Sequence, residues 1–135
     1  MPLVGGGGAG NVAGSNPTGV GTSFNIIGDH GYAYSGNIDI DNNVTTMLDF
    51  STGNYYVIAT YQPGYVQKTG DDYDFQLTFD DQAICGIHQE VLHQTPLTPI
   101  QLLIPPYTRV VVTGQNTTDT STNGVFVNIV GRVYA

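Results

Sequence analysis

The chain has 135 residues, a formal net charge of −8 and only three basic side chains. Its length suits one domain. Nucleic acids and anionic membrane surfaces are bound through clustered Lys and Arg, so neither is an expected partner. Strong helix formers are scarce, with one Glu and one Lys in the whole chain, whereas Gly, Tyr, Thr, Val and Asn are abundant. This composition favours strands and turns over helices.

Residues 1–22 are rich in glycine and are expected to form an extended N-terminal arm. Eight of the 18 glycines lie within this segment. Its apolar anchors are Leu3, Val4, Val12 and Val20, too few to offset the conformational entropy lost on ordering. We therefore predict an arm that binds a partner through these four side chains, followed by a single domain of residues 23–135.

From residue 23 onward, short segments of alternating apolar and polar residues are separated by turn signals, as is typical of an antiparallel β-protein. Residues 74–79 alternate most regularly. The expected strands cover residues 24–27, 32–40, 44–50, 55–61, 74–79, 83–90, 100–104, 109–113 and 125–134. About eight antiparallel strands with turn-rich connections predict an all-β domain, a single jelly roll or β-sandwich.

Two of these strands carry more specific expectations. Alternation within residues 44–50 predicts that the even-numbered residues, such as Leu48, lie on one face of the strand and that Met47 lies on the other. Pro63 and Gly64 are expected to end the preceding strand, because proline cannot donate a hydrogen bond to a neighbouring strand.

One group of acidic residues has part of the spacing of a calcium-binding loop. Asp39, Asp41 and Asn43 match its first three ligand positions. Val44 stands where the turn glycine belongs, and Phe50 stands where the bidentate glutamate belongs. We interpret this group as an acidic turn, and a calcium site built from several loops stays open as the alternative.

The histidines and the single cysteine form no recognisable site. His88 and His93 are five residues apart, so they would lie on opposite faces of a continuous strand. Cys85 lies in an apolar run and is expected to be a small buried hydrophobe. Without a nucleophile motif, a phosphate-binding loop or paired cysteines, we expect no enzymatic activity, no cofactor and no metal.

The chain has nine tyrosines, more than one small core is expected to need. Tyr55, Tyr61 and Tyr65 lie in or near one expected strand and its loop. Tyrosine combines apolar area with a polar tip, which suits protein interfaces and sugar stacking as well as cores. These three are candidates for an oligomer interface or for ligand stacking, with core and rim packing as the alternative.

Several short motifs lie in the later part of the chain. They are the segment at residues 104–108 (IPPYT), the valine-rich strand that follows it, and the segment at residues 130–134 (VGRVY). With the strands on either side of Gly53, they resemble small jelly-roll virion proteins of phages, over about residues 43–135. The resemblance implies a homo-oligomeric capsid-decoration, cement or fibre-head protein, often a trimer, that binds a major capsid protein or another virion protein.

The expected function is therefore that of a structural protein on the capsid surface. The alternative is a carbohydrate-binding β-sandwich that forms an adhesive head, which the tyrosines and acidic loops would support. The chain does not begin with the basic and apolar segments of a secretory signal, and no window of 18 apolar residues would span a membrane, so neither is expected.

Overall fold

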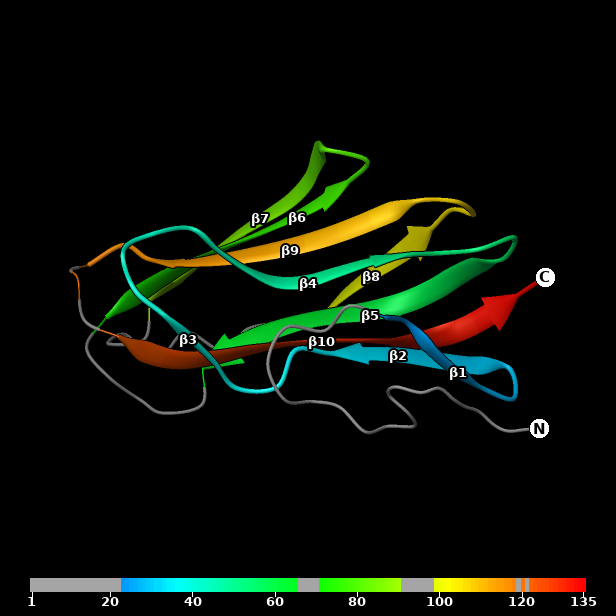
Figure 1. The fold of residues 1–135 in the computed structure, drawn as a ribbon, viewed down its shortest axis with the longest axis horizontal. Helices are drawn as coiled ribbons and strands as arrows, with labels where there is room; N and C mark the ends of the chain where they lie inside the picture. Colours follow the sequence, from blue (N-terminus) through cyan, green and yellow to red (C-terminus); the bar gives the residue numbers. More distant parts are fainter. Residues whose placement is uncertain (1–22, 66–70, 91–98, 119, 121) are drawn as a thin grey trace.

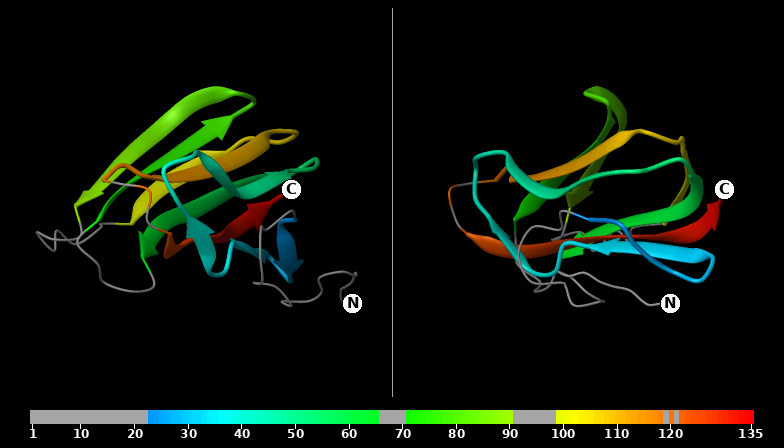
Figure 2. Two further views of the ribbon diagram at one scale, coloured as in Figure 1. Left: turned by 60° about the vertical axis from the view of Figure 1, so that its left-hand side comes forward. Right: turned by 45° about the vertical axis from the view of Figure 1, so that its right-hand side comes forward.

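The structure, a computed structural model, describes residues 23–65, 71–90, 99–118, 120 and 122–135. Within these residues every regular element is a strand, and the strands form two antiparallel sheets. Figure 1 shows the sheets as two layers, and Figure 2 shows the same layers from two further sides. The predicted all-β, two-sheet architecture is confirmed.

The two sheets differ in size. The six-stranded sheet has the order β1-β2-β10-β5-β8, with β3 also paired to β10, and the four-stranded sheet has the order β4-β9-β6-β7. The strands are β1 (Asn25–Ile27), β2 (His30–Tyr34), β3 (Ile38–Ile40), β4 (Thr45–Ser51), β5 (Tyr56–Tyr65), β6 (Asp72–Phe79), β7 (Gln82–Glu90), β8 (Ile100–Ile104), β9 (Arg109–Asn116) and β10 (Asn123–Tyr134).

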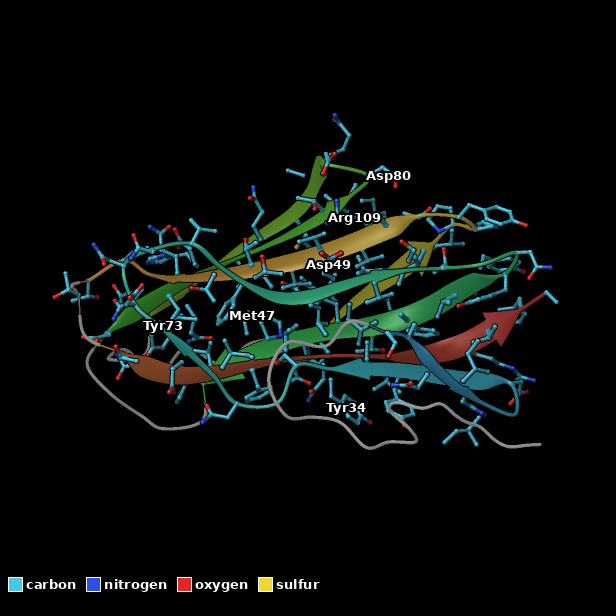
Figure 3. The ribbon with its side chains drawn as sticks, viewed as in Figure 1. Tyr34, Met47, Asp49, Tyr73, Asp80 and Arg109 are labelled. Carbon is cyan, nitrogen blue, oxygen red and sulfur yellow. The ribbon has the colours of Figure 1, made fainter. Side chains whose placement is uncertain are left out.

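The core lies between the two sheets and is supplied by alternate residues of each strand. The alternation predicted for residues 74–79 is confirmed, because Phe75 and Leu77 are buried whereas Asp74 and Gln76 are exposed. Figure 3 shows Met47 and Tyr73 between the layers. The fully buried large side chains are Tyr61, Tyr73, Phe75, Ile40, Met47, Leu48, Leu77, Ile104, Ile129, Gln89 and Val57.

The predicted alternation in residues 44–50 was wrong at its centre. A β-bulge in β4 shifts its register with β9 between Thr46 and Leu48. Met47 and Leu48 are consequently both buried, although they are adjacent in the chain, whereas Val44 is exposed. An extra residue in one strand turns two successive side chains toward the same side, and simple alternation cannot anticipate it.

The prediction that Pro63 and Gly64 end the fifth strand was also wrong, because β5 continues to Tyr65. Pro63 pairs with Val127 on β10. The N–H and C=O groups of Val127 both bond to Ser35, on the other side of β10. Since both backbone groups of Val127 point toward Ser35, Val127 makes no backbone hydrogen bond to Pro63, and the nitrogen of Pro63 points away from β10, toward β8. The described pairing of β8 with β5 ends at Tyr61, before Pro63 is reached. Proline is tolerated here because no strand needs its missing donor.

The single strand expected at residues 32–40 is divided into β2 and β3. Ser35 bridges the interruption with its backbone N–H and its side-chain Oγ, which bond to Val127 at 3.0 and 2.8 Å.

The turn between β6 and β7 matches the predicted position, and Asp80 and Asp81 both have positive φ angles, 49° and 69°. Two such residues suit the tight turns of hairpins.

A pair of glycine substitutions tests this packing. A Cβ at Gly131 on β10 would overlap the backbone of Ile58 and Ala59 on β5, so Gly131→Ala should lower the free energy of unfolding by about 1–3 kcal/mol. At Gly86 on β7 a Cβ would meet nothing within 4 Å, so Gly86→Ala should raise it by about 0.5–1 kcal/mol. Urea denaturation measures both, and equal stability of the two variants would contradict the described strand pairing.

Candidate functional site

The outer face of the six-stranded sheet is determined by the register of β10 with its neighbours. Asn128 pairs with Tyr34 on β2 and with Gln62 on β5. Val127 and Ile129, on either side of Asn128 in the chain, are buried between the sheets. Asn128 therefore points away from the core, and these three paired residues form a row across the outer face. Figure 3 shows Tyr34 on this side of the sheet.

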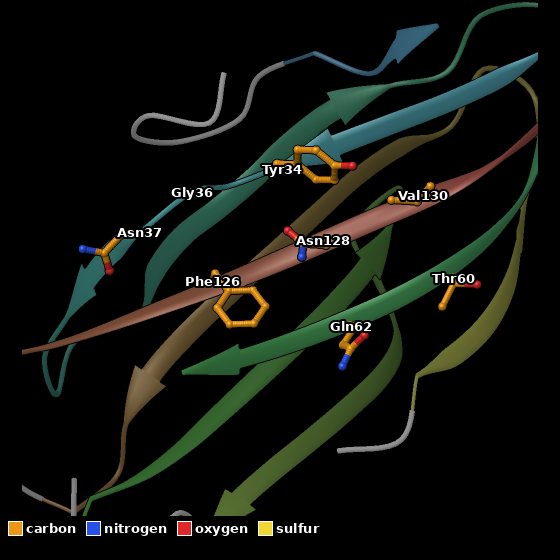
Figure 4. A pocket seen from close by; sticks show the side chains of 8 residues that line it. All are labelled: Tyr34, Gly36, Asn37, Thr60, Gln62, Phe126, Asn128 and Val130. Atoms are coloured by element: carbon orange, nitrogen blue, oxygen red, sulfur yellow. The ribbon is translucent and has the colours of Figure 1, made fainter. Parts of the chain in front are cut away.

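An open groove lies over this row (Figure 4). Its volume is about 510 Å³, within the range of small-ligand sites. The rings of Tyr34 and Phe126 stand on either side of Asn128. The lining carries no charged side chain and combines aromatic rings, amides and a hydroxyl: Tyr34, Gly36, Asn37, Thr60, Gln62, Phe126, Asn128 and Val130.

The position of the Phe126 ring depends on a glycine in the next strand. Gly64 on β5 pairs with Phe126 on β10. A Cβ at Gly64 would come within 2.7 Å of Phe126 Cζ, so the ring occupies the space that a side chain at position 64 would take. Glycine within a strand often marks such a close approach. The Phe126 ring thus lies against the backbone of β5 and forms one end of the groove.

The amide side chains in the groove are available to a ligand. Among the residues that the structure describes, Asn37, Gln62 and Asn128 make no side-chain hydrogen bond to the protein. Asn37 and Gln62 are exposed, and Asn128 is half-buried. An amide offers two donor hydrogens and an acceptor oxygen, so the groove presents several neutral hydrogen-bonding groups beside two aromatic rings.

A second tyrosine extends the aromatic surface of the groove. The ring of Tyr32 lies beside that of Tyr34, with centroids 4.9 Å apart and planes tilted by 35°. Partial burial, and then the neighbouring Tyr34, raise the pKa of the Tyr32 phenol. This shift disfavours ionisation of a phenol that is already uncharged at neutral pH.

An apolar patch occupies the other end of the same outer face. We define it as Tyr56, Ile58, Leu103 and Tyr134. Ile58 pairs with Leu103 on β8, and Tyr56 pairs with Tyr134 on β10. The two tyrosine rings are stacked with centroids 5.1 Å apart, and Ile58 and Leu103 are 40% and 56% exposed. The groove begins next to the patch, since Val130 and Thr60, which pair with each other, both line it.

Acidic residues are more frequent in the strands of the four-stranded sheet. Strands β2, β5, β8 and β10 contain no Asp or Glu, and β3 carries the exposed Asp39, whereas β4 and β6 carry Asp49, Asp72 and Asp74. Arg109 on β9 binds Asp49 through two hydrogen bonds of 3.0 and 2.8 Å, which lower the pKa of the Asp49 carboxyl. The side chain of His88 on β7 pairs with Asp74. Charged groups thus occur on both sheets, since the six-stranded sheet carries Asp39 on β3 and Arg132, paired with Asp29, on β10.

The three tyrosines singled out from the sequence do not share a surface. Tyr61 is completely buried, Tyr65 packs partly buried against the core, and Tyr55 is half-buried with its ring stacked on that of Phe24, with centroids 6.3 Å apart. Tyr61 therefore cannot contact a partner in this structure. The outward-facing residues of β5 are its alternate members, including Tyr56 and Ile58.

The other sequence candidates are distributed over the molecule. Leu3, Val4, Val12, Val20 and His93 lie outside the described residues. Asp41 Oδ1 accepts a hydrogen bond of 2.8 Å from the N–H of Asn43, as in a local turn. In the described part of the chain, no three His, Cys, Asp or Glu side chains gather closely enough to hold a metal ion. Cys85 is a free cysteine that packs partly buried against the core.

Sequence reasoning predicted the last strand, whose outward-facing residues include Phe126, Asn128 and Val130. It did not identify the groove, because Tyr34 and Gln62 come from segments far apart in the chain. The sequence signal that could have indicated the groove is the alternation of Phe126 and Asn128 with the buried valines of β10.

Comparison with protein families, with curated proteins and with solved structures found no match to this chain. No helix in the described residues is long and apolar enough to cross a membrane.

The buried Tyr61 hydroxyl gives a prediction about stability. Within the described structure, Tyr61 Oη has no hydrogen-bond partner, and burial raises the pKa of this phenol. An unsatisfied buried hydroxyl costs about 1–3 kcal/mol, so Tyr61→Phe should keep or increase the free energy of unfolding. Tyr61→Ala, which removes the ring, should lower it by about 3–5 kcal/mol. Thermal and urea unfolding provide the measurement, and a loss of stability in Tyr61→Phe would indicate an interaction of the hydroxyl.

Proposed function

We propose that this chain is a structural virion protein that acts by self-association and by binding to a capsid shell. The observation that carries the proposal is the apolar patch of Tyr56, Ile58, Leu103 and Tyr134 on the outer face of the six-stranded sheet. The motifs at residues 104–108 and 130–134, which resemble those of phage jelly-roll virion proteins, add support.

The order of the strands supports a jelly roll as the particular form of this sandwich. If β2 and β3 are taken as one interrupted strand, and β1 as an addition, each sheet has four strands, in the orders β2-β10-β5-β8 and β4-β9-β6-β7. Consecutive strands from β3 to β10 then alternate between the sheets, except for the β6–β7 hairpin. Jelly rolls of eight strands are common in viral capsid and lectin domains.

The distribution of charge favours self-association through the apolar patch. Each copy carries a net charge of −8, so copies repel one another wherever acidic faces meet. The patch has no carboxylate, and tyrosine and aliphatic side chains are typical of the buried centre of an interface. Arg132, beside the patch, is paired with Asp29 at 2.8 Å and lies 5.8 Å from the centre of the Tyr134 ring. A closed homo-oligomer is the ordinary outcome of such self-association, and the trimer comes from the resemblance.

The arm of residues 1–22 provides the second contact in this proposal. Its glycines permit the backbone to lie close against a partner strand, and Leu3, Val4, Val12 and Val20 serve as side-chain anchors. The partner is a major capsid protein or another virion protein. The arm thus tethers the domain to the shell, and the domain of residues 23–135 folds without it.

The oligomer is tested by substitution in the patch. The unmodified chain should form a closed oligomer by light scattering at tens of micromolar, and Leu103→Asp or Ile58→Asp should convert it to a monomer. Each substitution buries a carboxylate in the contact, without a facing cation at position 103 and, at position 58, opposite an Arg132 that already binds Asp29, and this burial costs several kcal/mol. Ile84→Asp is the matched control, because Ile84 is 48% exposed on β7 of the other sheet. A monomeric unmodified chain, or oligomers that survive both patch substitutions, would refute this interface.

The tether is tested by deletion of residues 1–21. The truncated chain should keep its melting temperature within a few degrees and should bind purified particles weakly or not at all. Mass spectrometry of particles that carry the full-length chain establishes the location first. The tether hypothesis fails if the truncated chain still decorates particles normally, or if it no longer folds.

A further inference from the structure

We propose that the groove between β2, β10 and β5 binds neutral oligosaccharides. The proposal concerns a ligand site and does not depend on the virion function or on the apolar patch. It arises from the lining, in which aromatic rings and unpaired amides occur together without any charge.

The two rings of the groove suit the apolar faces of sugars. Tyr34 and Phe126 lie diagonally across neighbouring strands, on either side of Asn128. Such diagonal positions are about 7–8 Å apart, so the rings form two separate stacking surfaces. The C–H faces of a sugar ring pack on the electron-rich face of an aromatic ring. The separation of the rings and the volume of about 510 Å³ favour a ligand longer than a single sugar.

The polar groups of the groove suit hydroxyls, which both donate and accept hydrogen bonds. Asn37, Gln62 and Asn128 each offer donors and an acceptor, and the described structure leaves all three amides without a protein partner. They come from different elements: the segment between β2 and β3, β5, and β10. The groove therefore presents hydrogen-bonding groups from several directions around the two rings, as recognition of a sugar requires.

The charges of the molecule select against anionic ligands. No Lys, Arg or His lines the groove, and the chain as a whole carries a charge of −8. A sialylated or sulfated glycan, or a nucleotide, would meet no compensating cation and would be repelled over longer distances. A proline-rich peptide also packs on aromatic side chains, but it makes little use of three free amides. Neutral oligosaccharides match both parts of the lining.

The test measures binding of defined sugars to the full-length chain. Saturation-transfer NMR is recorded with three neutral probes, lactose, N,N′-diacetylchitobiose and cellotetraose, and with sialyllactose and a proline-rich peptide. At least one neutral probe should bind, and sialyllactose and the peptide should not. If no neutral probe binds, or if sialyllactose or the peptide binds in preference, the proposal is wrong.

Substitutions then locate the binding. Tyr34→Ala and Asn128→Ala should each weaken the neutral sugar about tenfold or more, whereas Tyr34→Phe, which keeps the ring, should change it less than about threefold. Tyr107→Asn is the matched control, since Tyr107 is a 74% exposed tyrosine outside the groove, and asparagine tolerates its φ of 52°. Unchanged affinity in both alanine variants would overturn the assignment to this groove. The apolar patch is intact in all of these variants, so light scattering should give each of them the oligomeric state of the unmodified chain. A loss of sugar binding without a change in oligomeric state therefore concerns the groove alone.

Discussion

The pairing of β10 with β2, β3 and β5 is the interaction on which the rest of the structure depends. β10 is the longest strand, with 12 residues, and it lies at the centre of the six-stranded sheet. Its register fixes both sides of that sheet at once. Val125, Val127 and Ile129 fill the core, and Phe126 and Asn128 face outward beside residues of β2 and β5. A shift of one residue would exchange the two sets, so the core and the candidate site are specified together.

Both proposals rest on the outer face of the six-stranded sheet. Acidic residues and their partners occupy the four-stranded sheet, where they keep an acidic chain well hydrated. The six-stranded sheet also carries Asp39 and the Arg132–Asp29 pair, but its outer face holds an apolar patch and an uncharged groove lined by aromatic and amide side chains. The patch and the groove are neighbours on this face, since Ile58 of the patch and Thr60 of the groove lining are alternate residues of β5. A β-sandwich is compatible with both proposals, because function depends on the site and not on the fold alone.

Alternation in the sequence succeeded where a strand is regular and failed where the backbone departs from a regular pleat. The pattern of β6 predicted its buried face correctly. In β4 the bulge turned both Met47 and Leu48 inward, and in β5 the strand continued through Pro63 and Gly64. Each failure has a local cause in a neighbouring strand. The bulge in β4 belongs to its register with β9, and β5 continues through Pro63 and Gly64 because the pairing of β8 with β5 has ended and the Phe126 ring covers Gly64. Such causes are invisible until the neighbour is known.

The sequence by itself determined that the chain is all-β, which segments form strands, and which face of the most regular strands is apolar. These properties follow from residues close together in the chain, through composition, period and turn chemistry. Only the tertiary structure decided which strands are neighbours, and so which side chains meet. Tyr61, which the sequence offered as a surface candidate, is in the core, whereas Tyr34, Gln62 and Asn128 gather from three distant segments into one row. Hydrogen bonds between strands are made by backbone groups that every residue except proline carries, so local sequence does not encode which strand pairs with which.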